Sequence, residues 1–287
     1  MPTEKIAQLN RLTENMQFEP DGDMPFQSPP VCAEAHTDPA GEVYQAAAGG
    51  RKVKLLKTLL TSACERDCYY CPFRAGRDFR RETLKPEELS AAFIRMQRAN
   101  IVEGLFLSSG IAAGGMKTQD RLIDSAEILR HKYQYRGYLH LKIMPGAERD
   151  QVLRAMQLAD RISINLEAPN ETRLGNLAPH KNFWGELLTP LRWAEEIRQS
   201  LPSHLGWSGR WPSLTTQFVV GAVGENDLEL LATSEFLFSR LRLARTYYSA
   251  FNPVADTPLE NHKAENPIRQ LRLYQASFLL RDYGFGL

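Results

Sequence analysis

The sequence has few cysteines, almost no net charge and no long apolar run. Only four of its 287 residues are cysteine, too few for a disulfide-stapled secreted domain. Its 35 lysines and arginines nearly balance 34 aspartates and glutamates, so the net charge of +1 gives no global field that attracts nucleic acid or an acidic membrane. No run of about eighteen apolar residues and no apolar signal core is present. We therefore expect a cytoplasmic protein without a membrane partner.

Three of the four cysteines lie in one short segment. Cys64, Cys68 and Cys71 have the spacing C-x3-C-x2-C. A cubic iron–sulfur cluster normally takes one thiolate per iron, so three thiolates leave one iron open to another ligand. Zinc with a distant fourth ligand is the alternative, although structural zinc sites favour paired C-x2-C units and the chain has no second pair. Cys32 lies in a proline-rich segment and is interpreted as an incidental thiol.

The cysteine segment resembles the signature of the radical S-adenosylmethionine (SAM) enzymes, including an aromatic residue, Tyr70, before the third cysteine. In that family the open iron of a 4Fe-4S cluster is chelated by the methionyl group of SAM. An electron from the reduced cluster cleaves SAM, and the resulting 5'-deoxyadenosyl radical abstracts hydrogen from the substrate. The resemblance therefore implies a 4Fe-4S cluster and SAM as cofactors, with an external flavodoxin- or ferredoxin-like electron donor.

Short apolar segments alternate with amphipathic helical segments after residue 50. Strands are predicted at 53–60, 104–109, 138–144, 161–166, 214–220 and 245–251. Helices are predicted at 86–100, 119–133, 149–158, 185–200, 225–240 and 267–283. Sixfold alternation predicts a parallel sheet with right-handed crossovers. Six units are too few for a closed eight-unit barrel, so the pattern favours an α/β fold of the partial (β/α)6 TIM type, which the resemblance also implies.

The first fifty residues have a different character. A helix is predicted at 4–16, and the following stretch is interrupted by five prolines. We therefore divide the chain into a partly irregular N-terminal leader at 1–50 and a barrel domain at 51–287. The cysteine segment directly follows the first predicted barrel strand, and active sites of parallel barrels gather at the carboxyl ends of the strands.

Alternation within the strands predicts which side chains face the barrel lumen. Lys142 lies on the polar face of its strand, and Asn165 and Glu167 lie on the polar face of the next. Helices must cover the apolar faces, so the polar side chains are expected to point inward, toward a bound cofactor. A buried ion pair between Lys142 and Glu167 is the alternative.

The resemblance also implies cofactor-binding residues at the strand ends. Family members carry Gly-Gly-Glu after the second strand, where this sequence has Ser108-Ser109-Gly110 and no glutamate. Asn165 and Glu167 lie where the family places contacts to ribose and methionine, and Gly221 lies in an element that packs adenine. The implied cofactor-binding residues are Tyr70, Ser108, Ser109, Gly110, Lys142, Asn165, Glu167, Gln217 and Gly221.

Four stretches resemble, more narrowly, a subgroup of radical SAM proteins associated with DNA modification and repair. They are residues 103–111, 137–146, 177–181 and 273–281. This resemblance implies a nucleic-acid substrate and a uracil-DNA-glycosylase-like protein partner. Members of the subgroup tend to continue into a helix-hairpin-helix segment, so we expect that this segment was lost here or that the sequence is a fragment.

A basic segment follows the cysteines. With the nearby rings of Phe73 and Phe79 it is a candidate for holding phosphates and stacking bases of a nucleic acid. A solvated loop with local acidic partners is the alternative. The candidate substrate-binding residues are Arg74, Arg77, Arg80 and Arg81.

Two other functions are compatible with the same motif. A sulfur-inserting or methylthio-transferring enzyme typically needs a second cluster, for which only Cys32 remains. A metal-stabilised binding protein is the non-enzymatic alternative. The leading interpretation is a radical SAM enzyme that acts on a substrate with a nucleic-acid component.

Overall fold

The computed structural model describes residues 3–14, 16, 43–48 and 51–287. Its centre is a seven-stranded sheet whose strands follow one another in chain order. The strands are β1 (Val43–Ala48), β2 (Arg51–Leu59), β3 (Gly104–Ser108), β4 (Leu139–Lys142), β5 (Arg161–Ser163), β6 (Ser213–Val220) and β7 (Arg245–Ala250). Strands β2 to β7 are parallel, and β1 pairs antiparallel with β2 at one edge.

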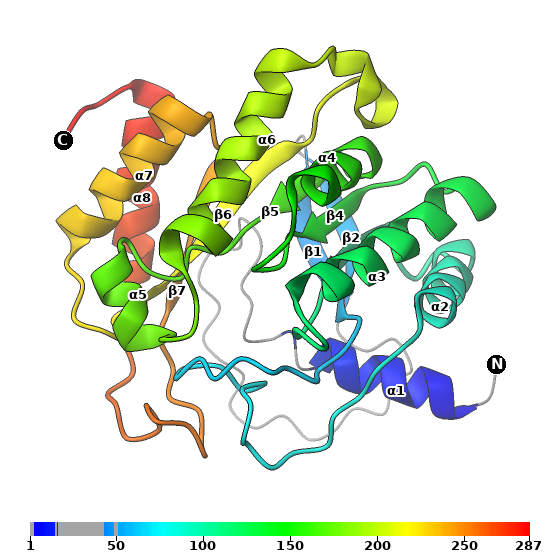
Figure 1. Ribbon diagram of the computed structural model, residues 1–287, viewed down its shortest axis with the longest axis horizontal. Coiled ribbons are helices and arrows are strands. Elements are labelled where there is room, and N and C mark those ends of the chain that lie inside the picture. The colour runs from blue at the N-terminus through cyan, green and yellow to red at the C-terminus, as the bar shows by residue number, and fades with distance from the viewer. Residues whose placement is uncertain (1–2, 15, 17–42, 49–50) are drawn as a thin grey trace.

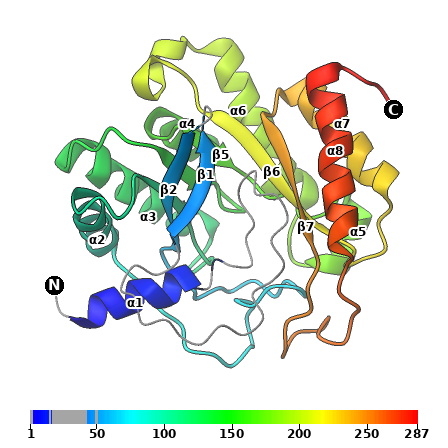
Figure 2. The same cartoon turned by 180° about the vertical axis from the view of Figure 1, so that it is seen from behind.

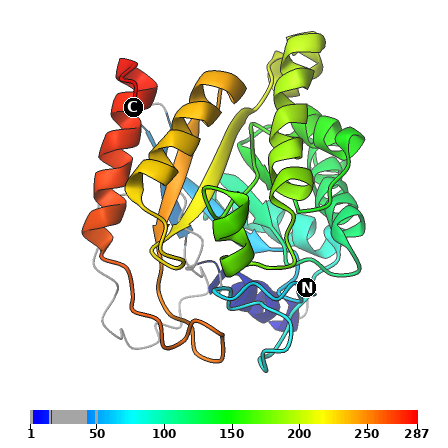
Figure 3. The ribbon, with the colours of Figure 1, turned by 60° about the vertical axis from the view of Figure 1, so that its left-hand side comes forward.

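Helices connect the parallel strands and cover one face of the sheet (Figure 1). They are α2 (Pro86–Arg98), α3 (Gly115–Glu127), α4 (Arg149–Leu158), α5 (Glu171–Leu177), α6 (Thr189–Ser200), α7 (Asp227–Leu241) and α8 (Pro267–Tyr283), with α1 (Thr3–Glu14) before the sheet. From behind, β1, β2, β6 and β7 lie in front of α3, α4 and α6 (Figure 2). Helix α8 packs beside α7 at the far edge (Figure 3). The predicted partial (β/α)6 barrel is confirmed.

The strand and helix sequences explain this arrangement. All five residues of β3 and all four of β4 are buried, as expected for parallel strands enclosed on both sides. Helix α7 begins with a capping box, in which the Asn226 side chain accepts from the Glu229 amide at 2.9 Å and the Glu229 carboxylate accepts from the Asn226 amide at 2.8 Å. The core between sheet and helices includes Leu105, Leu141 and Ile162, which are fully buried.

The predicted elements differ from the structure mainly at their ends. Strands β4 and β5 stop early, at Lys142 and Ser163, because the residues that follow leave the ladder and line a cavity. Helix α5 was not predicted, since seven residues show too little periodicity. Short helical turns extend α3 (Ile128–Lys132), precede α6 (Phe183–Leu188) and follow it (Ser203–Leu205 and Trp207–Gly209).

The leader contributes to the same sheet. The predicted N-terminal helix is present as α1, but β1 was not predicted, because the run Val43–Ala48 lacks the polar–apolar alternation of a half-buried strand. Residues 17–42, which include Cys32 and all five prolines of the leader's irregular stretch, lie outside the described residues. Within the part of the chain that the structure describes, none of the helices is long and apolar enough to span a bilayer.

Candidate active site

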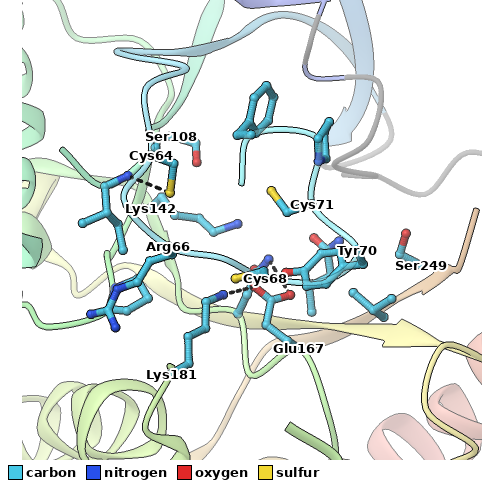
Figure 4. Close-up of a pocket in the computed structure, with 18 of the residues that line it drawn as sticks. Cys64, Arg66, Cys68, Tyr70, Cys71, Ser108, Lys142, Glu167, Lys181 and Ser249 are labelled. Carbon is cyan, nitrogen blue, oxygen red and sulfur yellow. Dashed lines mark hydrogen bonds and ion pairs between the residues drawn. The ribbon is translucent and has the colours of Figure 1, made fainter. Parts of the chain in front are cut away.

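A cavity of about 330 Å³ opens at the carboxyl ends of the parallel strands, and the three clustered cysteines form part of its wall (Figure 4). Every one of the parallel strands, or the segment directly after it, contributes to the lining. The polar lining residues are Arg66, Ser108, Ser109, Lys142, Asn165, Glu167, Lys181, Gln217, Ser249, Asn252 and Gln270. The predicted cofactor residues, except Gly221, therefore surround one space together with the cysteines.

The cysteine loop (residues 64–71) leaves the end of β2 and runs beside the end of β3. The Gly110 amide donates to the Thr61 carbonyl at 2.7 Å, and the Glu65 amide donates to the Ile111 carbonyl at 2.8 Å. This approach requires a glycine, because a Cβ on Gly110 would lie 2.3 Å from the Ala63 carbonyl oxygen. The Ile111 amide also donates to the Cys64 sulfur at 3.4 Å. Strand β3 thus fixes the first cysteine.

The rest of the loop is held by a segment from the other side of the barrel, residues 177–186, which we term the clamp. The Tyr69 amide donates to the Leu177 carbonyl at 2.9 Å. Arg66 donates to the His180 carbonyl and pairs with Glu186 at 2.5 Å. The sequence between the cysteines is therefore occupied by residues that anchor the loop and leave the sulfurs facing the cavity.

One buried carboxylate joins the clamp, the cysteine loop and the end of β5. Glu167 forms an ion pair with Lys181 at 2.9 Å, and Asn165 lies at 3.5 Å from its other oxygen. Burial raises the pKa of Glu167, but Lys181, Lys142 and a hydrogen bond from Tyr70 outweigh it, so the net pKa is lowered and the group is charged. Burial and the Glu167 charge hold the pKa of Tyr70 well above its usual value, so its hydroxyl is a donor.

The backbone at Glu167 is unusual. Its φ of 65° lies in the left-handed region, which side chains other than glycine, asparagine and aspartate seldom adopt. The Glu167 amide donates to the Gln217 carbonyl at 2.9 Å, and the Val219 amide donates to the Glu167 carbonyl at 2.8 Å, so strand β6 holds this conformation. A strained backbone persists only where the surrounding structure holds it, and such positions are concentrated at functional sites.

The cysteines fit a cluster that binds through three thiolates. They are free thiols, they lie in one loop, and all three line the cavity. Burial raises the pKa of Cys68, and Lys181 opposes this effect, so a nearby cation favours the thiolate form that binds metal. No group of three His, Cys, Asp or Glu side chains that would hold a single metal ion is found among the described residues. The fit therefore rests on the shared loop and the shared cavity.

The structure gives Glu167 and Gly221 surroundings that the strand pattern did not predict. Glu167 takes Lys181 as its ion-pair partner at 2.9 Å, whereas Lys142 acts on it as a neighbouring charge. Gly221 does not line the cavity. It has φ of 88°, and a Cβ there would lie 2.2 Å from a carboxylate oxygen of Glu265, so glycine is required by the turn after β6 and by the close approach of Glu265.

The basic segment lies after the cysteine loop, and none of its four arginines lines the cavity. Arg81 donates to four backbone carbonyls, those of Ser62, Phe73, Arg74 and Arg77. Arg77 donates to the carbonyls of Pro72 and Ala255. Arg80 pairs with Glu82 at 2.7 Å, with 71% of its own side chain exposed. Much of the donor capacity of this segment is therefore used to fold the loop.

Sequence reasoning missed Lys181 and Arg66. Each pairs with a residue far away in the sequence: Lys181 with Glu167 after β5, and Arg66 with Glu186 in the clamp. The only signal in the sequence was that residues 177–181 belong to a stretch that resembles other radical SAM proteins, and no role was assigned to them.

Comparisons with known proteins agree with this geometry. The family model described as "Radical SAM superfamily" matches residues 58–237. No curated protein matches the chain. Among solved structures, the hydrogenase maturase HydG from Carboxydothermus hydrogenoformans has 16% identity and a TM-score of 0.61, with coverage of 81% of this chain and 52% of that one. Methylornithine synthase (PylB) has 18% identity and a TM-score of 0.59, with coverage of 80% and 64%.

At these identities the solved structures show the fold alone, and this chain spans about half the length of the maturase. The family model covers 58–237, more than half of the chain, and includes the cysteine loop, β3 to β6 and the clamp. It resolves the superfamily and no subgroup. The chain belongs to the radical SAM superfamily, whose enzymes use a 4Fe-4S cluster and SAM.

Proposed function

We propose that this enzyme cleaves SAM reductively and uses the resulting radical to abstract hydrogen from a substrate bound in the cavity. The observation that carries the proposal is that three cysteine sulfurs and polar strand ends share one cavity of about 330 Å³. When bound, the cluster and SAM supply the electron transfer and the radical chemistry. The protein's own groups must therefore bind and orient the cofactors and the substrate, and exclude water from the cavity.

The residues divide these tasks according to their positions. Cys64, Cys68 and Cys71 would hold the cluster, and the clamp keeps their loop against the barrel. Ser108, Ser109 and Gly110 offer backbone and hydroxyl groups at the end of β3, beside Cys64. Asn165, Glu167 and Gln217 offer polar groups at the ends of β5 and β6. These are the groups we expect to hold the methionyl and ribose parts of SAM.

Anaerobic reconstitution tests the proposal. We expect about four irons per chain and a broad thiolate-to-iron absorption, and Ala at Cys64, Cys68 or Cys71 should abolish both. The matched control is Cys32→Ala, which should leave the spectrum unchanged. Uptake of one zinc in place of iron would contradict the proposal. About eight irons would instead favour the sulfur-inserting alternative, which needs a second cluster. Family membership decides against the metal-stabilised binding protein.

We also propose, as the narrower function, that the substrate has a nucleic-acid component. The support is local: the Phe73 ring lines the cavity, its centroid lies 6.2 Å from that of Phe79, and the guanidinium of Arg81 lies 4.4 Å from the centroid of the Phe79 ring. Since Arg77 and Arg81 are occupied by carbonyls, Arg74 and Arg80 carry the remaining capacity for phosphate. The buried Arg74 Nε has no hydrogen-bond partner, and Arg80 is exposed.

Binding of single-stranded nucleic acid at low salt is the test. Affinity should fall steeply as salt is added, and Arg74→Ala with Arg80→Ala should reduce both the affinity and the salt slope. A matched exposed arginine on α6, Arg192→Ala, should change neither. Absence of binding with cluster and SAM in place would move the proposal to a small metabolite or a protein substrate. The uracil-DNA-glycosylase-like partner and a cytoplasmic location, with a flavodoxin- or ferredoxin-like donor, belong to the same proposal.

A further inference from the structure

Lys181 brings a cation to the wall that carries the cluster ligands. Its side chain is only 9% exposed, and it lines the same cavity as Cys64, Cys68 and Cys71. Figure 4 shows the chain of Lys181 extending from the clamp toward the sulfur of Cys68 and the carboxylate of Glu167. A lysine is seldom buried unless its charge is compensated. The buried ammonium of Lys181 therefore places a fixed positive charge beside the cysteine sulfurs.

The ion pair with Glu167 does not cancel this effect at the cysteines. One oxygen of Glu167 accepts from the Lys181 ammonium at 2.9 Å, and its other oxygen lies 3.5 Å from the side-chain amide of Asn165. The carboxylate charge is therefore shared between Lys181 and the end of β5. The Lys181 side chain extends toward Cys68, so its ammonium keeps a field of its own at the wall that the cysteines form.

We propose that Lys181 is a positioning residue that raises the reduction potential of the cluster by stabilising its reduced form. The inference rests on the cluster of the proposed function. Reduction transfers one electron from the external donor to the oxidised cluster and adds one negative charge to it, while no bond in the protein is broken. A fixed cation nearby favours the more negative form, and local charge is one of the factors that set cluster potentials. Burial strengthens this effect because solvent screening is weak.

Redox titration of the reconstituted protein without SAM, followed by the electron paramagnetic resonance of the reduced cluster, tests the inference. In Lys181→Met we expect the ratio of reduced to oxidised cluster, at the wild-type midpoint, to fall about tenfold, which is a shift of about 59 mV to more negative potential for one electron. Lys181→Arg keeps the charge and should stay within about threefold of the wild type. Lys117→Met is the control for loss of an exposed charge outside the cavity and should not shift the potential.

A second variant keeps the test informative if the single substitution destabilises the loop. Without its lysine, Glu167 can take up a proton, so Lys181→Met combined with Glu167→Gln fixes a neutral pair. This double variant should shift the potential in the same direction by an equal or smaller amount. If both Met variants fail to assemble a cluster that Lys181→Arg assembles, Lys181 is needed for assembly and the inference is overturned.

Four further outcomes are decisive. An unchanged potential in Lys181→Met overturns the inference, and so does an equal shift in Lys117→Met. A loss of SAM affinity with an unchanged potential would assign Lys181 to cofactor binding instead. Failure of the wild-type protein to take up about four irons would count against the proposed function itself, and this result is distinguishable because it appears before any titration.

Discussion

Strand β5 has an ion pair at each end, and the two pairs are built differently. At the amino end Asp160 pairs with Arg130 at 3.0 Å, and at the carboxyl end Glu167 pairs with Lys181 at 2.9 Å. Both cations are withdrawn from solvent, with 0% and 9% of their side chains exposed. The two sites therefore compare the use of buried charge at opposite ends of one strand.

The hydrogen-bonding groups of the pair at the amino end are taken up by neighbouring protein groups. Arg130 donates to the carbonyls of Leu158, Tyr135 and Gly137 at 2.8 to 2.9 Å, and its guanidinium lies 3.9 Å from the Trp207 ring. Asp160 also accepts from the Leu139 amide at 2.9 Å. The planar, five-donor guanidinium thus joins several backbone segments at once, which a lysine would not do. This pair contributes to the stability of the fold.

The pair at the carboxyl end is open on one side. Glu167 and Lys181 both line the cavity, next to the cysteines, and Glu167 has a left-handed backbone conformation. In parallel barrels the carboxyl ends of the strands carry the active site, whereas the amino ends serve the stability of the fold. The two pairs differ in hydrogen-bond saturation more than in burial, and we therefore predict that the saturated pair serves the fold and the open pair serves the cofactor site.

The largest effect on stability is expected at the amino end. Arg130→Met removes the ion pair and three carbonyl hydrogen bonds, and should lower the free energy of unfolding by about 3–5 kcal/mol, the usual cost of breaking a buried pair. Denaturant unfolding measures this loss. The folded fraction should still assemble the cluster, since Arg130 does not touch the cavity.

Arg130→Lys sharpens this prediction. It keeps a positive charge but cannot reach all the carbonyls, so it should recover only part of the lost stability. If Arg130→Met lost the cluster while its unfolding free energy stayed at the wild-type value, the division of the two ends into structural and functional roles would be wrong.

The comparison also shows what the sequence can predict. The six parallel strands follow from apolar runs that alternate with amphipathic helices, and Cys64, Cys68 and Cys71 follow from spacing alone. Both signals are local. The inward direction of Lys142 and Glu167 follows from strand alternation, because period 2 assigns each side chain to a face.

Contacts between distant segments were beyond the same reasoning. An ion pair between Glu167 and Lys142, on the neighbouring strand, was the alternative to a cofactor contact, but the ion-pair partner is Lys181, from a loop that no periodic pattern describes. Arg81 was predicted to hold phosphate, and in the folded loop it holds four carbonyls. The positive charge of an arginine is visible in a sequence, whereas the acceptors that surround it are created by the fold.

The smaller effect on stability, and the larger effect on function, is expected at the carboxyl end. Glu167→Ala leaves Lys181 without its partner, but water in the cavity can hydrate the ammonium, so the loss in unfolding free energy should be about 1–3 kcal/mol and smaller than that of Arg130→Met. The cluster should still assemble, because Glu167 is not a ligand. SAM should bind about 10 to 100 times more weakly, since a hydrogen bond to a charged group contributes about 1.5–3 kcal/mol.

Equilibrium dialysis of SAM against the reconstituted protein measures this loss of affinity, and the exposed Glu196→Ala is the matched control. Unchanged SAM affinity in both Glu167→Ala and Asn165→Ala would mean that these side chains serve the loop alone. The open pair would then be structural, like the pair at the other end of the strand.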